Sequence, residues 1–460
     1  MIKQSIYNQF LIIICIGLLS FESYSTNFAV NITTDTQDAN PGDGVCSDPG
    51  GNCSIRAAIM EANALPGADV INIPGGVYLL SIAGSGEDLC LTGDFDINSD
   101  IVITGASAVN TILNGDSLDR VFHILNAGVV DISGIEIREG FANPGNGGGI
   151  LNEGVLNLLE THISENACEL NTGGTTAGGF GGGVSNEGTL TIDQSTIFFN
   201  TSRGGQGNNG VTGGGGGGSS PGFGGGIYNG PSGSITMVNS TVSGNQAIGG
   251  ARSGGSGNGG SWGTAGRNGS HILFGIGGAA GGGNGTGGGQ YAGGGGGGSQ
   301  ASAPGSGGIG GYGAGGGGGG ARAGGGTGAV GGNGGFGGGN GGQACCSSGA
   351  GGGAGAGFGG GIFNDGGTFT VNNSTIAFND AIGGAGSAGN GGWTQAGQSG
   401  SGIGGGVFNR SGTFDLSVSI IGANSADVSD ADINGTLTST NGYNFIENLG
   451  SGILGGTTAG

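Results

Sequence analysis

The stretch GGGVSNEGTLTIDQSTIFFN, residues 181–200, decides the fold because the chain repeats it. It holds three glycines, an asparagine, a turn, a short alternating strand and a second asparagine. Four further copies begin with GGGILNEG, GGGIYNG, GGGIFNDG and GGGVFNRSG, and we align HILNAG, residues 123–128, as a less obvious sixth. Repetition of one short strand unit indicates a repeat architecture.

Two asparagines mark each unit. The first are Asn126, Asn152, Asn186, Asn229, Asn364 and Asn409, and the second are Asn166, Asn200, Asn245, Asn379 and Asn424. Within a unit the two lie 14 to 16 residues apart, whereas successive first asparagines lie 26 to 135 residues apart. The variation in length therefore enters after the second asparagine, at one corner of the unit.

A unit of roughly 20–26 residues with short strands and one variable corner predicts one turn of a parallel β-solenoid. Isoleucine and valine should stack inside, with coils about 4.8 Å apart. The asparagines should form hydrogen-bonded ladders, and the glycine runs should allow a left-handed or sharply bent backbone. A propeller is disfavoured because its blades of about 40 residues are longer than this unit.

A helix is predicted just before the first coil. In CSIRAAIMEAN, residues 53–63, the apolar Ile55, Ala58, Ile59 and Ala62 have helical spacing. Ser54 is a suitable N-cap, and Pro-Gly follows as a stop signal. We expect a helix over 54–63 to cover the open apolar end of the solenoid, with a strand over 70–73.

This stretch resembles the motif C-S-L-R-E-A-I-x-x-A-N of secreted bacterial β-helix proteins, and residues 68–80, 93–115 and 419–446 also look like that kind of protein. The resemblance implies a right-handed parallel β-helix, mostly from uncharacterised surface proteins. Ala57 stands where the motif has Glu, which removes a capping-box partner. The repeats loosely resemble those of chlamydial polymorphic outer-membrane proteins, although GGG replaces GGA and no autotransporter barrel follows.

The fold prediction is therefore an all-β, right-handed parallel β-helix with an N-terminal capping helix and a long glycine-rich insertion. We divide the chain into five parts: a signal peptide (1–25), an N-terminal cap (26–69), the first part of the β-helix (70–245), the insertion (246–357) and the last part of the β-helix (358–460). The last part ends without a recognisable anchor. We expect the chain either to be a fragment or to be retained by partners.

Residues 1–25 have the positive start, apolar run and small residues of a secretory signal. A membrane anchor is the alternative, but the apolar run is shorter than the ~20 residues that a span needs. No later segment is long and apolar enough to span. The net charge is −21, and Lys3 is the sole lysine. We expect a secreted or cell-surface protein that does not bind nucleic acid.

Six cysteines remain after the signal: Cys46, Cys53, Cys90, Cys168, Cys345 and Cys346. Their pairing stays open, with a bridge between Cys46 and Cys53 as the best guess. Zinc is a poorer interpretation, because His123, His162 and His271 are scattered and no C-x-x-C occurs.

The insertion, residues 246–357, is about half glycine. It is interpreted either as a flexible loop or as packed extended chains whose backbones approach closely. Apolar islands such as residues 272–274 would anchor packed chains. In both cases we predict that the coils ending at Asn245 and beginning at Phe358 are direct neighbours.

No catalytic, cofactor-binding or metal-binding residue can be assigned. Carboxylates on adjacent coils, Asp131 with Glu136 or Glu160 with Glu165, are the remaining acid–base candidates, against ordinary solvated acids. Structural calcium is a weak alternative to ordinary polar loops, and its candidates are Asp35, Asp38, Asn40, Asp43, Asp427, Asp430 and Asp432.

We therefore predict a non-catalytic scaffold or adhesin that binds surface glycans or a neighbouring cell. The alternative is a polysaccharide lyase or glycoside hydrolase. A carboxylate cluster on one solvent-facing sheet would favour the enzyme, and faces of Ser, Thr and Asn would favour the scaffold.

Overall fold

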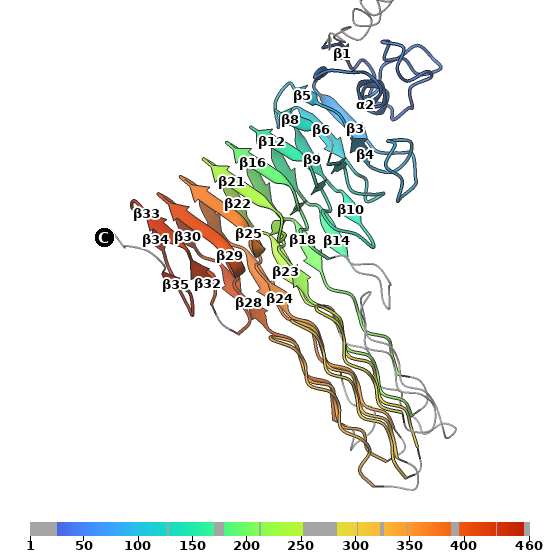
Figure 1. The fold of residues 1–460 in the computed structure, drawn as a ribbon, viewed down its shortest axis with the longest axis vertical. Coiled ribbons are helices and arrows are strands. Elements are labelled where there is room, and N and C mark those ends of the chain that lie inside the picture. Colours follow the sequence, from blue (N-terminus) through green and yellow to red (C-terminus); the bar gives the residue numbers. More distant parts are fainter. Residues whose placement is uncertain are drawn as a thin grey trace, which may run out of the picture.

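The computed structural model describes residues 25–126, 128–169, 179–210, 213–251, 283–300, 302–322, 326–346, 348–387, 395–428 and 430–454. Within these residues the chain forms a parallel β-helix, from which a narrow extension projects (Figure 1). The proposed signal peptide lies almost wholly outside the described residues. Among the described residues, no helix is long and apolar enough to cross a membrane.

The strands of successive coils pair in parallel throughout four sheets. The largest, of 17 strands, contains β1 (Asn27–Ala29), β2 (Asp69–Ile73), β4 (Phe95–Ile97), β5 (Ile101–Gly105), β7 (Phe122–Ile124), β8 (Val129–Ser133), β11 (Ile150–Asn152), β12 (Val155–Leu159), β15 (Val184–Asn186), β16 (Thr189–Asp193), β20 (Ile227–Asn229), β21 (Ser234–Val238), β25 (Ile362–Asn372), β29 (Val407–Ser417), β32 (Ile433–Leu437), β33 (Ser439–Asn441) and β35 (Ile453–Leu454).

Three smaller sheets complete the coils. The nine-stranded sheet contains β3 (Gly76–Leu79), β6 (Thr111–Asn114), β9 (Glu136–Arg138), β13 (His162–Ser164), β17 (Thr196–Phe198), β22 (Thr241–Ser243), β26 (Thr375–Ala377), β30 (Ile420–Gly422) and β34 (Phe445–Ile446). The six-stranded sheet contains β10 (Phe141–Ala142), β14 (Ala167–Glu169), β18 (Thr201–Arg203), β23 (Gln246–Ile248), β27 (Asp380–Ile382) and β31 (Ser425–Ala426). The three-stranded sheet contains β19 (Gly222–Phe223), β24 (Gly357–Phe358) and β28 (Gly402–Ile403).

The interior of the β-helix is a stack of identical positions. One row, fully buried, consists of Ile150, Val184, Ile227, Ile362 and Val407, and another consists of Leu156, Leu190, Ile235, Phe369 and Phe414. Alternation along each strand sends these side chains inward and their neighbours outward. The repeated unit therefore folds as the sequence predicts.

Two asparagine ladders run along the stack. In the first, the Asn152, Asn186, Asn229 and Asn364 amides each donate to the next amide oxygen, at 2.7 to 2.9 Å, and Asn409 ends the row. The second, at 2.9 Å, runs from Asn166 through Asn200, Asn245 and Asn379 to Asn424. Asn424 donates in turn to the Asp432 carboxylate at 2.8 Å. The ladders satisfy buried amides that would otherwise destabilise the turns.

The alignment of Asn126 with these ladders is wrong. The register pairs Asn152 with Ile124, and Asn126 is exposed. This coil lacks the glycine run at its corner, and an apolar side chain occupies the ladder position. The sixth copy is thus displaced by two residues from the alignment that its sequence suggests.

A third row, which was not predicted from the sequence, joins backbone N–H groups to hydroxyl groups. The backbone N–H groups of Thr161, Ser195, Ser240 and Ser374 donate to the next serine hydroxyl at 3.0 to 3.1 Å. The recurring serine before the third strand of the unit carries this signal in the sequence.

The glycine run begins each corner with a left-handed residue, for example Gly181 with φ of +69°. The long excursions leave after the strand that follows the second asparagine and return just before this run. Strands β20 to β23 pair directly with β25, β26 and β27, on either side of the longest excursion. The prediction that these two coils are neighbours is confirmed.

Helix α2 (Ile55–Ala64) closes the first coil. Its N-cap is Ser54, whose hydroxyl accepts a hydrogen bond from the Ala57 N–H at 3.0 Å. The Ile55 and Ile59 side chains are buried in the apolar interior of the solenoid. The helix therefore takes the predicted place, shifted by one residue.

Candidate functional site

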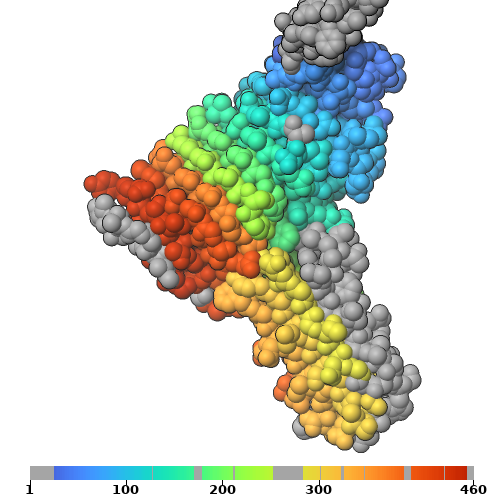
Figure 2. All heavy atoms as spheres, in the orientation of Figure 1, coloured from blue at the N-terminus to red at the C-terminus, as the bar shows by residue number. Residues whose placement is uncertain are grey.

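The extension is built from three glycine-rich excursions of successive coils. We call it the glycine blade and define it by the described residues within 204–221, 249–356 and 383–401. Its chains run side by side away from the β-helix (Figure 1), and the space-filling view shows a narrow arm beyond the coils (Figure 2). The stretch at residues 272–274, expected as an anchor, lies outside the described residues.

The hydrogen bonds of the blade follow a period of three. From Gly215 to Ser220, consecutive N–H groups donate at 2.8 to 3.1 Å to three neighbouring chains in turn. The acceptors, in order, are the carbonyls of Gly297, Ala350, Asn208, Gly294, Gly353 and Gly205. The run from Gly315 to Gly320 repeats the scheme. Three residues per turn is the period of polyproline II, so the blade is a bundle of extended chains of this type.

Glycine is required in the blade by close approach. A Cβ placed on Gly215 would lie 2.0 Å from the Gly318 carbonyl oxygen, and one on Gly218 would lie 1.9 Å from that of Gly315. The described parts of the insertion therefore follow the interpretation of packed extended chains, rather than that of a flexible loop.

An aromatic cluster joins the blade to the outside of the β-helix. Tyr228, Phe363 and Phe408 stack outward from β20, β25 and β29, with ring centroids 5.9 and 5.3 Å apart. Phe223 on β19 and Phe358 on β24 pack on or beside them, as do the blade residues Tyr291, Tyr312 and Phe336. We call these eight side chains the aromatic root.

A buried carboxylate fixes the root. Asp365 accepts hydrogen bonds from the Tyr228 hydroxyl at 3.0 Å and the Tyr291 hydroxyl at 2.5 Å, and forms an ion pair with Arg410. Burial, with the Asp365 charge, raises the pKa of both tyrosines, which therefore remain donors. The Arg410 guanidinium also lies 4.9 Å from the Tyr312 ring centre. Coil and blade are thus tied by charge as well as by ring packing.

The solvent faces of the central coils carry rows of hydroxyl groups. Register alignment produces three such rows: Thr189, Ser234, Thr368 and Thr413; Thr191, Thr236 and Thr370; and Thr196, Thr241 and Thr375. These side chains are exposed or half-buried. Hydroxyl groups therefore line these solvent-facing positions of the central coils.

The predicted acid–base candidates occupy ordinary surface positions. Asp131 on β8 accepts from the Asn157 amide at 2.7 Å, and Glu136 on β9 accepts from the Ser164 hydroxyl at 2.8 Å. Glu160 and Glu165 are exposed at turns, with φ of +50° and +57°. None of the four belongs to a group of close metal-ligating side chains among the described residues.

The calcium candidates are also placed apart from such a group within the described chain. Asp35 is paired with Arg56, which is fully buried, at 2.6 Å. Asp38 accepts from the Asn40 and Ser47 N–H groups, and Asp43 accepts from the Val45 N–H. Asp430 and Asp432 accept from nearby N–H groups in the last coil. These carboxylates are thus engaged by an arginine or by backbone N–H groups of the chain itself.

Carboxylates do gather near the N-terminal end, around His123 on β7. Asp96 on β4 lies opposite His123 in the register, and Asp88 approaches from the loop between β3 and β4. Beside them, Arg120 forms an ion pair with Asp94 at 2.8 Å. Burial raises the pKa of Asp94 to about 7, against the opposing effect of Arg120. Among the described residues, Asp88, Asp96 and His123 are the one group whose atoms have metal-ligand proximity.

This group was not predicted from the sequence. Its signal is the alternation of Asp94 and Asp96 one coil before His123. Because the alignment of Asn126 was displaced by two residues, it placed His123 opposite a glycine run. The register of His123 with Asp96 could therefore not be predicted.

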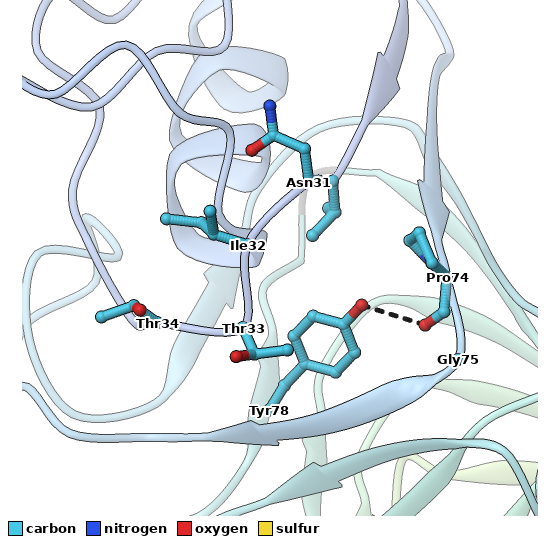
Figure 3. A pocket seen from close by; sticks show the side chains of 8 residues that line it. Asn31, Ile32, Thr33, Thr34, Pro74, Gly75 and Tyr78 are labelled. Atoms are coloured by element: carbon cyan, nitrogen blue, oxygen red, sulfur yellow. Dashed lines mark hydrogen bonds between the residues drawn. The ribbon is translucent and has the colours of Figure 1, made fainter.

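A shallow cavity of about 380 Å³ lies beside α2 (Figure 3). Residues 30–34 form one wall, and Pro74, Gly75 and Tyr78 form the other. The Tyr78 hydroxyl donates to the Pro74 carbonyl at 2.9 Å and is thereby occupied. The lining contains no aspartate, glutamate or histidine.

The Cys46–Cys53 disulfide is present, as predicted. Cys90 and Cys168 are buried and unpaired, and burial raises the pKa of each thiol to about 12. Adjacent Cys345 and Cys346 are half-buried free thiols in the blade.

No family model, no curated protein and no solved structure matches this chain. The parallel β-helix is therefore established by the strand register alone, and function has to be argued from the geometry above.

Proposed function

We propose that the protein is secreted or displayed on a cell surface, where it acts as a non-catalytic scaffold or adhesin. The observation that carries the proposal is the glycine blade, a packed arm that projects from a β-helix whose apolar core closes without it. The motif at residues 53–63 supports a place among secreted bacterial right-handed β-helix proteins.

The blade is unfavourable to build for stability alone. Glycine loses more backbone freedom on ordering than other residues, and extended glycine chains bury little apolar surface in return. The arm is nevertheless fixed by regular hydrogen bonds and by the aromatic root. An ordered arm that adds little to stability favours a role in binding a partner outside the molecule.

Several features support an extracellular address. The first residues have the composition of a secretory signal. The Cys46–Cys53 disulfide suits an oxidising compartment. The net charge of −21 disfavours nucleic acid, and the hydroxyl rows suit contact with neutral glycans. Surface glycans or a neighbouring cell are therefore the proposed partners.

The direct test compares the mature chain with a variant in which residues 249–355 are replaced by a short Gly-Ser turn. Labelled proteins are incubated with a polysaccharide panel and with intact cells. We expect the blade-replaced variant to lose at least tenfold in binding. A control with the exposed Asn126 changed to alanine keeps both the blade and the hydroxyl rows and should bind as the parent does. Equal binding by parent and blade-replaced variant would count against the blade as the contact element.

A polysaccharide lyase or glycoside hydrolase is the second candidate. The observation in its favour is the gathering of Asp94, Asp96 and His123 beside Arg120. A degradation assay on the same polysaccharides distinguishes the two proposals. New reducing ends or unsaturated ends, lost on His123→Ala, would favour the enzyme over the adhesin.

A further inference from the structure

The geometry points to a binding site for one divalent transition-metal ion formed by Asp88, Asp96 and His123. This inference goes beyond the scaffold role and does not depend on it. The ligand atoms would be a carboxylate oxygen from each aspartate and Nδ1 of the imidazole. These atoms all lie within 4.8 Å of one another.

The spacing fits an ion better than a direct salt bridge. Asp96 Oδ1 lies 3.3 Å from His123 Nδ1, and Asp88 Oδ1 lies 3.6 Å from it. Charge-assisted hydrogen bonds are shorter, about 2.7–2.9 Å. With bonds of about 2.0–2.2 Å, tetrahedral ligand atoms lie about 3.3–3.6 Å apart. Each aspartate oxygen thus lies from Nδ1 at the separation that two ligands of one tetrahedral ion have.

Asp96 supplies the second, independent observation. Its side chain is fully buried, and Oδ1 has no hydrogen-bond partner, although it faces His123. Such an atom is destabilising without a cation or donor. The other oxygen, Oδ2, accepts from the Cys90 N–H at 3.0 Å and fixes the orientation of the carboxylate.

The far side of the imidazole is also arranged as in metal sites. His123 Nε2 lies 3.5 Å from Glu153 Oε2 and has no hydrogen-bond partner. A metal-bound histidine usually donates its second N–H to a carboxylate, which fixes the tautomer and raises the basicity of the ligand. Glu153, the residue after β11, stands where this partner belongs.

The ligand types select the metal. One imidazole with two carboxylates suits first-row divalent ions such as zinc, whereas calcium prefers six or more oxygen ligands. Three protein ligands leave the fourth tetrahedral position to water or an outside ligand. Asp88 is two-thirds exposed, so the site opens toward solvent.

The test uses the mature chain without a histidine tag, freed of metal with a chelator. Cobalt titration reports a tetrahedral site through its visible absorption bands, and zinc competition gives the affinity. We expect one ion per chain, displaced by zinc. His123→Ala and Asp96→Asn should each weaken binding at least 100-fold, and Glu153→Gln should weaken it 10- to 100-fold.

The matched control is His162→Ala, a half-buried histidine on β13 that packs against Phe198. Its affinity should equal that of the parent. Circular dichroism checks each fold, and the exposed Asp88→Asn replaces Asp96→Asn if the latter does not fold. Absence of saturable binding by the parent, or equal binding by the parent and folded His123→Ala, would overturn the assignment.

Discussion

The coils and the glycine blade both have to pair the backbone polar groups of stacked chains, and they differ in whether side chains fit between those chains. Both stack extended chains so that backbone N–H and C=O groups pair between neighbours. In a coil, the donors serve two neighbours and every second side chain fills the interior. In the blade, the donors serve three neighbours, and no room remains for a side chain on the inner positions.

This difference teaches where each region gains its stability. The coils gain mainly from buried apolar side chains, at roughly 25 cal/mol per Å². The blade has few such side chains and relies on its hydrogen bonds and its root. We therefore expect substitutions in the coils to affect the whole molecule and most substitutions in the blade to act locally.

The largest effect should come from Ile59→Asp in α2. A charge would face the apolar end of the coil stack, where Ile59 is fully buried. We expect a loss of at least about 4 kcal/mol in unfolding free energy, with aggregation visible by size-exclusion chromatography. Phe199→Asp, at a site 62% exposed, is the control and should leave a monomer. An unchanged melting temperature for Ile59→Asp would refute the cap.

Replacing residues 249–355 by a Gly-Ser turn should have the next largest effect. The coils on either side already pair, so the β-type circular dichroism should persist. Loss of Tyr291, Tyr312 and Phe336 uncovers the remaining rings of the root. We expect about 2–4 kcal/mol of lost burial and a lower solubility limit. Collapse of the β signal would show that the coils depend on the blade.

Asn186→Ala should cost about 1–3 kcal/mol, because it breaks the first ladder and leaves buried amides without partners. Chemical denaturation measures the change. Asn126→Ala serves as the control, since this asparagine is exposed and outside the ladder. Equal losses at the two positions would remove the ladder from the account of coil stability.

Gly215→Ala should have the smallest global effect. The new methyl group would press on the Gly318 carbonyl, and overpacking of this kind costs about 1–3 kcal/mol locally. We expect faster amide hydrogen exchange in the blade and an unchanged melting temperature for the coils. A methyl group in Gly287→Ala would lie 3.1 Å from the Ile309 side chain and 3.6 Å from its carbonyl oxygen, so the amide exchange of this variant should stay near that of the parent. Matching exchange in both variants would contradict close packing of the blade.

The sequence predicted the coils because their rules are local. The glycine run, the asparagine and the alternating strand recur at nearly fixed offsets, so the positions of the ladder from Asn152 to Asn409 follow from the sequence alone. The packed blade was only one of two interpretations of the sequence, because a period of three leaves no clear pattern where about half of the residues are glycine. Only its few rings, such as Tyr291 and Tyr312, mark where it attaches.

The group of Asp88, Asp96 and His123 was not predicted from the sequence, for another reason. Its members come from two coils and a loop, and they meet only when the register between those coils is known. An error of two residues at Asn126 was enough to separate His123 from Asp96. Register across irregular coils is set by packing, which the sequence alone does not specify.

The second asparagine ladder also has a direction. Every amide from Asn166 onward donates toward the C-terminal side, so the side-chain dipoles add head to tail, as peptide dipoles do in a helix. The row ends on Asp432, whose carboxylate accepts and, when ionised, has no proton to pass on. A negative group at the positive end of the aligned dipoles stabilises the row and ends it. The ladder therefore ends at this one side chain. An asparagine at position 432 would instead end the row on an amide N–H group, which could donate to one further coil.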